Sequence, residues 1–337
     1  MTSSTTSTSV PPATDELATS PFEIAGVRCE PGQRVDDTIR LSRSVNGDML
    51  GIPVMILHGA FRGPVVAIQA GIHGDEYDGQ QAVRELVASL DPASMHGTLL
   101  AIPCLNTAAF GAASRVSAID QANMNRIFPG DADGTFSLRL AAYYVSTIVP
   151  VIDAMVDLHT GGQFGEITPL AIVQRGYEDM ATELGLAAGH RVIWKGGSWG
   201  GTARASTLAA GKPAVTLEAG GGTYRDEVKD LHLRSITNIL RFFGVIDGEA
   251  EFLERYDAVN ATFSRAAVGG FYLARCEPGE VAEAGQVLAE IVDHYGTVVE
   301  TITAPDAGIV LWVRRIRTIN PGEETLIFGP IENQIVR

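Results

Sequence analysis

The sequence predicts an α/β fold with a largely parallel sheet, followed by a small all-β region near the C-terminus. Up to about residue 250, apolar runs rich in β-branched residues alternate with segments whose apolar residues recur at helical spacing. Beyond residue 261, short apolar runs are separated by Pro and Gly turns, without a helical pattern. Alternating strands and helices are typical of a parallel sheet that helices cover.

The expected elements follow in order along the chain. The first strands are expected between residues 22 and 60, where Pro31-Gly32 and Asn46-Gly47 predict turns. A buried central strand is predicted at 65–72, because a β-branched apolar run follows a Gly-Pro start. The later apolar runs that predict strands are 98–104, 151–158, 170–173 and 214–217. The segments with helical spacing of apolar residues are 82–90, 136–148, 178–189 and 226–243.

The change of pattern divides the chain into three parts. Residues 1–20 are rich in Ser and Thr and have the composition of a disordered tail. Residues 21–250 are expected to form the α/β domain. Residues 251–337 are expected to form a separate small C-terminal β domain.

The composition argues against several classes of protein. The chain has 337 residues and a formal net charge of −15, which disfavours a broad nucleic-acid-binding surface. Three widely spaced cysteines predict neither a disulfide framework nor a Cys-based zinc site. The first twenty residues lack the basic and apolar regions of a signal peptide, and no run of eighteen apolar residues occurs. We expect a cytoplasmic protein without nucleic-acid or membrane partners.

The strongest chemical signal is the segment Gly71-Ile72-His73-Gly74-Asp75-Glu76, between the predicted central strand and the first helix. His73 and Glu76, three residues apart on such a turn, can face one metal ion, and imidazole and carboxylate are both zinc ligands. The alternative is that Asp75 and Glu76 only favour the first helical turn through the helix dipole.

A third ligand candidate, His159, stands at the end of the apolar strand Val156-Asp157-Leu158-His159. In open α/β sheets, ligands collect at the carboxyl ends of strands, where His73 is also expected. Two imidazoles and one carboxylate with an open position form the arrangement of metal-assisted hydrolysis. Asp157 can orient an imidazole, or it can be a buried, hydrogen-bonded carboxylate of the strand.

Glu218 ends another apolar strand and precedes three glycines. A carboxylate at such a place is costly to bury without a purpose. Its functional interpretation is a general base that takes a proton from the attacking water and delivers it to the leaving amine. A structural salt bridge is the alternative.

Arginine and asparagine residues supply the fourth element. Asn125 and Arg126, side by side, can clamp a substrate carboxylate, because a guanidinium matches a carboxylate bidentately. Arg115 can face the metal and stabilise a developing oxyanion. Surface loops also often contain arginines, so this element depends on the other three.

The glycine-rich segment 194–202 contains two tryptophans and is either a loop over the pocket or a packed surface loop. The remaining histidines are expected to be caps, surface residues or satisfied core residues; they are His58, His96, His190, His232 and His294.

Four ordered motifs are similar to those of the succinylglutamate desuccinylase/aspartoacylase family, within the zinc carboxypeptidase-like superfamily. They are the His73–Glu76 segment, Asn125-Arg126-Ile-Phe-Pro-Gly, Asp157-Leu-His159-Thr and Leu217-Glu218. The likeness extends over roughly residues 50 to 330 and is nearest to the branch of N-acetyl-diaminobutyrate deacetylases. It implies a three-layer α/β/α domain with a mostly parallel mixed sheet and a C-terminal β domain.

The resemblance also implies a role for each motif residue. His73, Glu76 and His159 would bind one zinc ion per chain, and Glu218 would be the proton shuttle. Arg115 would polarise the scissile carbonyl, and Asn125 with Arg126 would hold the substrate carboxylate.

A second resemblance concerns the runs 281–291 and 303–310, which are similar to biotinyl/lipoyl-type β domains. Those domains attach their cofactor to a Lys at a hairpin tip. The corresponding segment here is Asp293-His294-Tyr295-Gly296, and no Lys follows Lys229. The prediction for this region is therefore a structural or lid-forming role.

Together these observations predict a zinc-dependent deacylase of small N-acylated amino acids. The alternatives are a carboxypeptidase acting on short peptides, and a catalytically silent zinc-binding protein. The charge of −15 favours a zwitterionic or partly cationic substrate over a dianion. The acyl group, the amino acid, a replacement of zinc by another divalent ion and the oligomeric state, including a homo-oligomer, stay open.

Overall fold

The structure is a computed structural model that describes residues 10–196 and 200–337. Six α-helices occur in these residues: α1 (Asp78–Ser89), α2 (Thr107–Gly111), α3 (Phe136–Thr147), α4 (Glu178–Ala187), α5 (Ala203–Ala209) and α6 (Asp226–Phe242). Three short 3-10 helices are η1 (Pro92–Ser94), η2 (Met124–Arg126) and η3 (Val149–Val151). None of the helices in the described ranges has the length and apolar composition of a membrane span.

The strands of the first 250 residues are β1 (Phe22–Ile24), β2 (Val27–Cys29), β3 (Gln33–Arg43), β4 (Met49–His58), β5 (Phe61–Ala70), β6 (His96–Ile102), β7 (Ala154–His159), β8 (Gly165–Ile172), β9 (Val192–Trp194) and β10 (Ala214–Gly221). The later strands are β11 (Arg255–Val259), β12 (Thr262–Arg265), β13 (Gly270–Ala274), β14 (Val281–Ala282), β15 (Val287–Val292), β16 (Val298–Thr303), β17 (Gly308–Arg314), β18 (Thr318–Ile319), β19 (Glu324–Gly329) and β20 (Ile331–Val336).

A large mixed sheet carries the fold, with the strand order β12-β19-β17-β8-β10-β7-β5-β6-β4-β3. Its centre, β6-β5-β7-β10, is parallel, whereas β3 and β4 on one side and β8, β17, β19 and β12 on the other pair antiparallel. The α/β prediction is confirmed, and the sheet is mixed. The parallel centre is explained by the helical crossovers, because parallel neighbours need a long connection.

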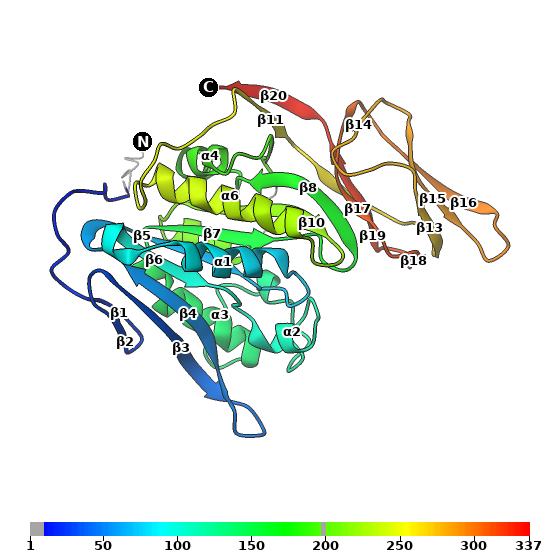
Figure 1. The fold of residues 1–337 in the computed structure, drawn as a ribbon. Coiled ribbons are helices and arrows are strands. Elements are labelled where there is room, and N and C mark those ends of the chain that lie inside the picture. The colour runs from blue at the N-terminus through cyan, green and yellow to red at the C-terminus, as the bar shows by residue number, and fades with distance from the viewer. Residues whose placement is uncertain (1–9, 197–199) are drawn as a thin grey trace, which may run out of the picture.

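Helices cover both faces of the central strands. α1 and α6 pack against each other on one face, with α4 beside α6 (Figure 1). α5 packs on β7 and β10, and α3 packs against α5. The buried side of α1 consists of the apolar residues whose helical spacing predicted it: Ala82, Val83, Leu86 and Val87. The three-layer α/β/α arrangement is thus confirmed.

Several element boundaries differ from the sequence expectation. β3 and β4 form one long hairpin of 11 and 10 residues in place of short strands, because Asn46-Gly47 is its only turn. β7 begins at Ala154 because Pro150 holds residues 149–151 in a 3-10 turn. The short helices α2 and α5 were not predicted. They are too short to show a helical period.

The C-terminal region is all-β, as predicted, and joins the main sheet. β17 pairs antiparallel with β8, and β19 and β12 follow it, whereas β13, β15, β16 and β18 form a separate sheet that extends away from the helices (Figure 1). The hairpin of β15 and β16 turns at residues 293–297, where the lipoyl-like likeness expects a tip. The domain boundary near residue 250 stays a prediction.

The predicted disordered tail also stays a prediction. Residues 1–9 lie outside the described residues. Thr14 and Ala18 donate backbone hydrogen bonds to the carbonyls of Arg62 and Ala60, along the beginning of β5.

Candidate metal centre and substrate cavity

The three predicted ligands come from two neighbouring strand ends. His73 and Glu76 lie between β5 and α1, and His159 is the last residue of β7. Gly71 has a φ of +69°, and a Cβ on Gly74 would lie 2.0 Å from the backbone of Ala109. Glycine at these two positions therefore allows the chain to turn tightly and bring His73 and Glu76 to the end of β7.

These ligand atoms meet in one buried cluster. One ligand atom from each of the three residues lies within 4.8 Å of the others. The Nδ1 atoms of His73 and His159 are 3.2 Å apart, and they lie 2.8 and 2.9 Å from the two carboxylate oxygens of Glu76. All three side chains are at most 3% exposed.

The outer nitrogen of each imidazole faces an oxygen. Nε2 of His159 is 2.9 Å from Oδ2 of Asp157, and Nε2 of His73 is 3.1 Å from Oδ1 of Asn123. These oxygens favour a proton on each Nε2, which leaves both Nδ1 lone pairs directed at the centre of the cluster. Two such nitrogens 3.2 Å apart beside a carboxylate form a donor set that fits a divalent cation such as zinc.

Several neighbouring groups stabilise the negative charge of Glu76. Burial raises the pKa of Glu76, but the imidazoles of His73 and His159 outweigh it and hold that pKa well below its usual range. Oε2 also accepts a hydrogen bond from the backbone N–H of Thr160, and Oε1 accepts one from Arg115. A carboxylate at the cluster therefore stays ionised, as a metal ligand must.

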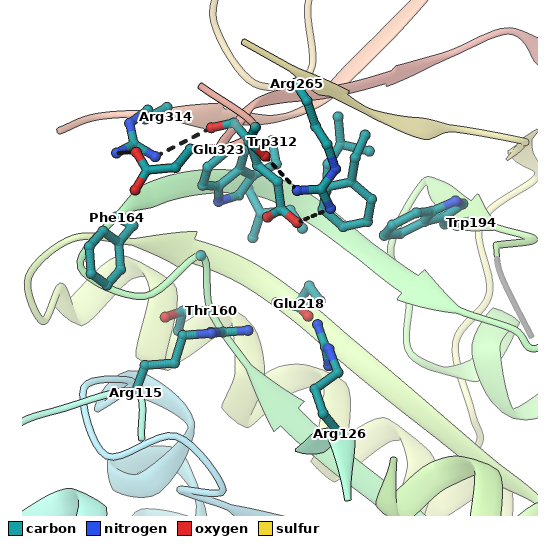
Figure 2. Close-up of a pocket in the computed structure, with 16 residues that line it drawn as sticks. Arg115, Arg126, Thr160, Phe164, Trp194, Glu218, Arg265, Trp312, Arg314 and Glu323 are labelled. Atoms are coloured by element: carbon teal, nitrogen blue, oxygen red, sulfur yellow. Dashed lines mark hydrogen bonds and ion pairs between the residues drawn. The ribbon is translucent and has the colours of Figure 1, made fainter. Parts of the chain in front are cut away.

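A cavity of about 400 Å³ lies next to the cluster, since Arg115, which contacts Glu76, and Thr160, which follows His159, line it (Figure 2). We call its lower side the floor; it consists of Arg115, Arg126, Thr160, Gly161 and Glu218. We call the opposite side the roof; it comes from β12, β17, β19 and the turn before β19, and consists of Phe263, Arg265, Trp312, Arg314, Gly322, Glu323, Glu324 and Ile327. Phe164, Ile167 and Trp194 close the sides.

Glu218 reaches the floor because β10 and β7 are parallel and in register. Its Cα is paired with that of His159 across the two strands. Burial raises the pKa of the Glu218 carboxyl to about 8, although His159 acts in the opposite direction. The structure thus places a carboxyl that can hold a proton beside the ligand cluster.

The predicted arginines and Asn125 are engaged differently. Nη1 of Arg115 is 2.9 Å from Oε1 of Glu76, so this guanidinium lies at the cluster. Arg126 lines the cavity. The amide of Asn125 lies 3.3 Å from Nε2 of His159, and its oxygen accepts the N–H of Ala203. Asn125 is buried beside the imidazole and does not line the cavity, so the two side chains do not form a common fork.

Sequence reasoning missed several residues of the site. Asn123 stands two residues before Asn125. The spacing of the motif residues does not predict its contact with His73. The roof residues belong to no motif. Of the segment 194–202, Trp194 ends β9 and lines the cavity, whereas residues 197–199, on which the prediction of a loop over the pocket depends, lie outside the described residues.

A His-Glu-His cluster at strand ends, below a cavity with a carboxyl group, is an arrangement found in metal-dependent hydrolases. Residues 62–243 match the family model of the succinylglutamate desuccinylase/aspartoacylase catalytic domain. The N-alpha-acetyl-L-2,4-diaminobutyric acid deacetylase of Halomonas elongata is 28% identical over 296 residues, which cover 83% of this chain and 86% of that protein.

Solved structures share the fold. A succinylglutamate desuccinylase/aspartoacylase from Rhodobacter sphaeroides is 26% identical with a TM-score of 0.80, over 88% of this chain and 96% of that one. The product-bound ectoine utilization protein EutE (DoeB) from Ruegeria pomeroyi is 24% identical with a TM-score of 0.82, over 95% and 98%. The chain belongs to the succinylglutamate desuccinylase/aspartoacylase family, whose named members hydrolyse amide bonds. The resemblance seen in the sequence is confirmed.

Proposed function

We propose that the chain is a zinc-dependent deacylase that hydrolyses the amide bond of a small N-acylated amino acid. The observation that carries this proposal is the buried cluster of His73, Glu76 and His159 directly below a cavity lined by Glu218 and Arg126. Family membership and the named activity of the Halomonas relative support the same reaction class.

In this proposal His73, Glu76 and His159 hold the zinc ion. A bound zinc ion supplies Lewis-acid polarisation of the carbonyl and lowers the pKa of a water to about 7. Asp157 keeps His159 in the orientation and tautomer that binding requires, since its carboxylate lies 2.9 Å from Nε2. Asn123 does the same for His73, and Asn125 packs against the His159 ring.

Glu218 is the proposed proton shuttle. Burial raises the pKa of this carboxyl group, so that its ionised form readily accepts a proton from the attacking water and can return it to the departing amine. Arg115, beside the ligand cluster, is placed to stabilise negative charge that develops on the carbonyl oxygen.

Arg126 is the proposed partner of the substrate carboxylate. Its guanidinium lies on the floor, and the pKa of this group is lowered by burial, which means that an anion there is poorly screened by water. The roof limits the space above the floor, so a cavity of about 400 Å³ fits a small substrate better than a peptide.

The test combines metal analysis with a substrate panel. We expect the purified chain to contain one zinc ion and to release acetate from acetylated amino acids. Removal of metal by a chelator is expected to stop the reaction, and zinc is expected to restore it. Faster hydrolysis of dipeptides would favour a carboxypeptidase. Zinc binding without hydrolysis of any amide would indicate a silent binding protein.

A further inference from the structure

The roof of the cavity is one face of the paired strands β12, β19 and β17, and β8 continues this face at the side of the cavity. Phe263 of β12 is paired with Ile327 of β19, Ile327 with Trp312 of β17, and Trp312 with Ile167 of β8. All four side chains line the cavity. They form an apolar row across the strands, next to which lies a row of charged side chains (Figure 2).

A β-bulge places Glu324 in the charged row. Phe263 and Arg265 are two residues apart on β12 and share a face, but their partners Ile327 and Glu324 are three residues apart on β19. Regular alternation would put Glu324 and Ile327 on opposite faces of the strand. The extra residue on β19 turns Glu324 to the cavity, which is a common effect of a bulge beside a functional site.

The charged groups of the roof differ in what they can still bind. Arg314 donates to the carbonyls of Thr318 and Glu324 and to the carboxylate of Glu323. Arg265 donates to the carbonyl of Gly322 and to Oε1 of Glu324. The guanidinium of Arg314 is thus largely engaged within the protein, whereas Arg265 makes two such hydrogen bonds and its side chain is 56% exposed.

The carboxylate of Glu324 can still accept a further hydrogen bond. Glu323 accepts hydrogen bonds from Arg314 and from the backbone and side chain of Asn320. Among the described residues, Oε2 of Glu324 has no hydrogen-bond partner, and its side chain is 40% exposed. Across the cavity, the negative charge of Glu324 also favours the protonated form of Arg126 in the floor. The roof therefore presents an available anionic acceptor to the cavity.

Aromatic side chains surround this acceptor. Phe263 and Trp312 lie in the apolar row, and Trp194 lies with its ring centroid 6.3 Å from that of Phe263. Aromatic faces attract cations and pack well against methylene groups. An apolar row beside a carboxylate matches a short methylene chain that ends in a positive charge.

We propose that the roof is the side-chain subsite and that Glu324 selects N-acylated amino acids whose side chain ends in an ammonium group. This inference rests on the proposed deacylase function, with Arg126 holding the α-carboxylate at the other end of the substrate. An anionic side chain would meet the carboxylate of Glu324, with which Arg265 is already paired, and would find the guanidinium of Arg314 engaged. The formal net charge of −15 also favours a cationic group over a second anion.

Three acetylated amino acids of similar length test this subsite: Nα-acetyl-L-2,4-diaminobutyrate, N-acetyl-L-norvaline and N-acetyl-L-aspartate. In the wild type we expect kcat/KM to be about 10- to 100-fold higher for the ammonium substrate than for norvaline, as for a charged hydrogen bond. Glu324→Gln should remove this advantage and leave the norvaline substrate within about threefold of its wild-type value.

Glu323→Gln is the matched control, because that neighbouring carboxylate is held by Arg314 and Asn320. It should keep the selectivity. A wild type that prefers the neutral or anionic substrate overturns the subsite, as does a Glu324→Gln variant that loses all substrates equally. Neither result would affect the proposed deacylase function.

Calorimetric binding of free L-2,4-diaminobutyrate and L-norvaline separates the two proposals, since it needs no catalysis. Tighter binding of the diamino acid by the wild type, lost in Glu324→Gln and kept in Glu323→Gln, supports the subsite even if no amide is hydrolysed. Equal binding of the two amino acids, or no binding, overturns it.

Discussion

The floor and the roof of the cavity are built in different ways. The residues of the ligand cluster below the floor, and Glu218 of the floor, stand near the ends of parallel strands in short motifs, such as His73–Glu76 after β5 and His159 at the end of β7. The roof residues come from antiparallel strands of the C-terminal region, and their neighbours across the sheet are about 15 residues away between β17 and β19 and about 60 residues away between β12 and β19.

In the proposed function, the floor serves the hydrolysis of the amide bond and the roof serves the choice of substrate. The floor carries the groups that a hydrolysis needs, held in place by strand register and by contacts such as that of Asp157 with His159. In the proposed function, the roof carries the aromatic and charged groups that contact the rest of a substrate. Changes in the floor should therefore affect the reaction of every substrate, whereas changes in the roof should affect the choice among them.

The largest effect is expected from Glu218→Gln in the floor. The amide keeps the shape of the side chain but cannot accept and return a proton, so kcat should fall by about 10³-fold or more. Zinc content should stay at the wild-type level, because Glu218 is not one of the clustered ligands. Normal turnover in this variant, measured by acetate release, would contradict the proposed role.

A smaller effect is expected below the floor, from Asp157→Asn. The amide is a poorer acceptor for Nε2 of His159, so zinc affinity should fall by about 10- to 100-fold. Competition with a chromogenic chelator measures this change. Asp306→Asn, at an exposed position of the C-terminal region, is the control and should leave the affinity unchanged.

Gly165→Ala tests the roof, because the added Cβ would meet a side chain of the roof. A Cβ at Gly165 would lie 2.2 Å from the ring of Trp312, so the ring must move. We expect a loss of about 1 to 3 kcal/mol in the free energy of unfolding and a higher KM, with zinc affinity unchanged. Urea unfolding and steady-state kinetics measure the two effects.

Gly111→Ala is the matched control, because a Cβ there meets no atom within 4 Å. If Gly165→Ala lowered zinc affinity as well, the floor and the roof would not be independent.

His190 lies in neither wall and should give the smallest effect, on stability alone. Burial, together with the nearby His232 and Arg234, lowers the pKa of His190 from 6.5 to about 3. The unfolded chain therefore takes up this proton first, and stability is lost as the pH falls through 6.5 toward the folded value. Between about pH 7.5 and pH 5.5 this group should cost about 1.4 kcal/mol.

Urea unfolding at the two pH values measures this loss, which should be smaller by about that amount in His190→Gln. The exposed His294→Gln should keep the wild-type pH dependence. An unchanged slope in His190→Gln would show that another group carries the effect.

Most of the fold could be predicted because its signals are local. β-branched runs and helical spacing mark β5, β7, β10, α1 and α6, and these elements agree with the structure. α2 and α5 were missed because five and seven residues are too few to show a period. The antiparallel flanks were underestimated, since a strand pattern does not state the direction of its neighbour.

The candidate site was predictable to the same extent. His73 and Glu76 share one turn, and parallel strands bring their carboxyl ends to one edge, so the cluster with His159 and the position of Glu218 follow from the order of the elements. The joint clamp of Asn125 and Arg126 did not follow, because adjacent residues on a 3-10 turn direct their side chains differently.

The amino-acid sequence alone determined the ligand types, their spacing and the strand ends on which they stand, because these depend on contacts between residues close in the chain. Only the tertiary structure decided which side chains lie opposite them across the cavity. Glu324 and Ile327 reach the same side of β19 through a bulge that forms when β19 pairs with β12, about 60 residues away in the chain. Such pairing depends on the packing of the whole sheet, and no stretch of sequence states it by itself.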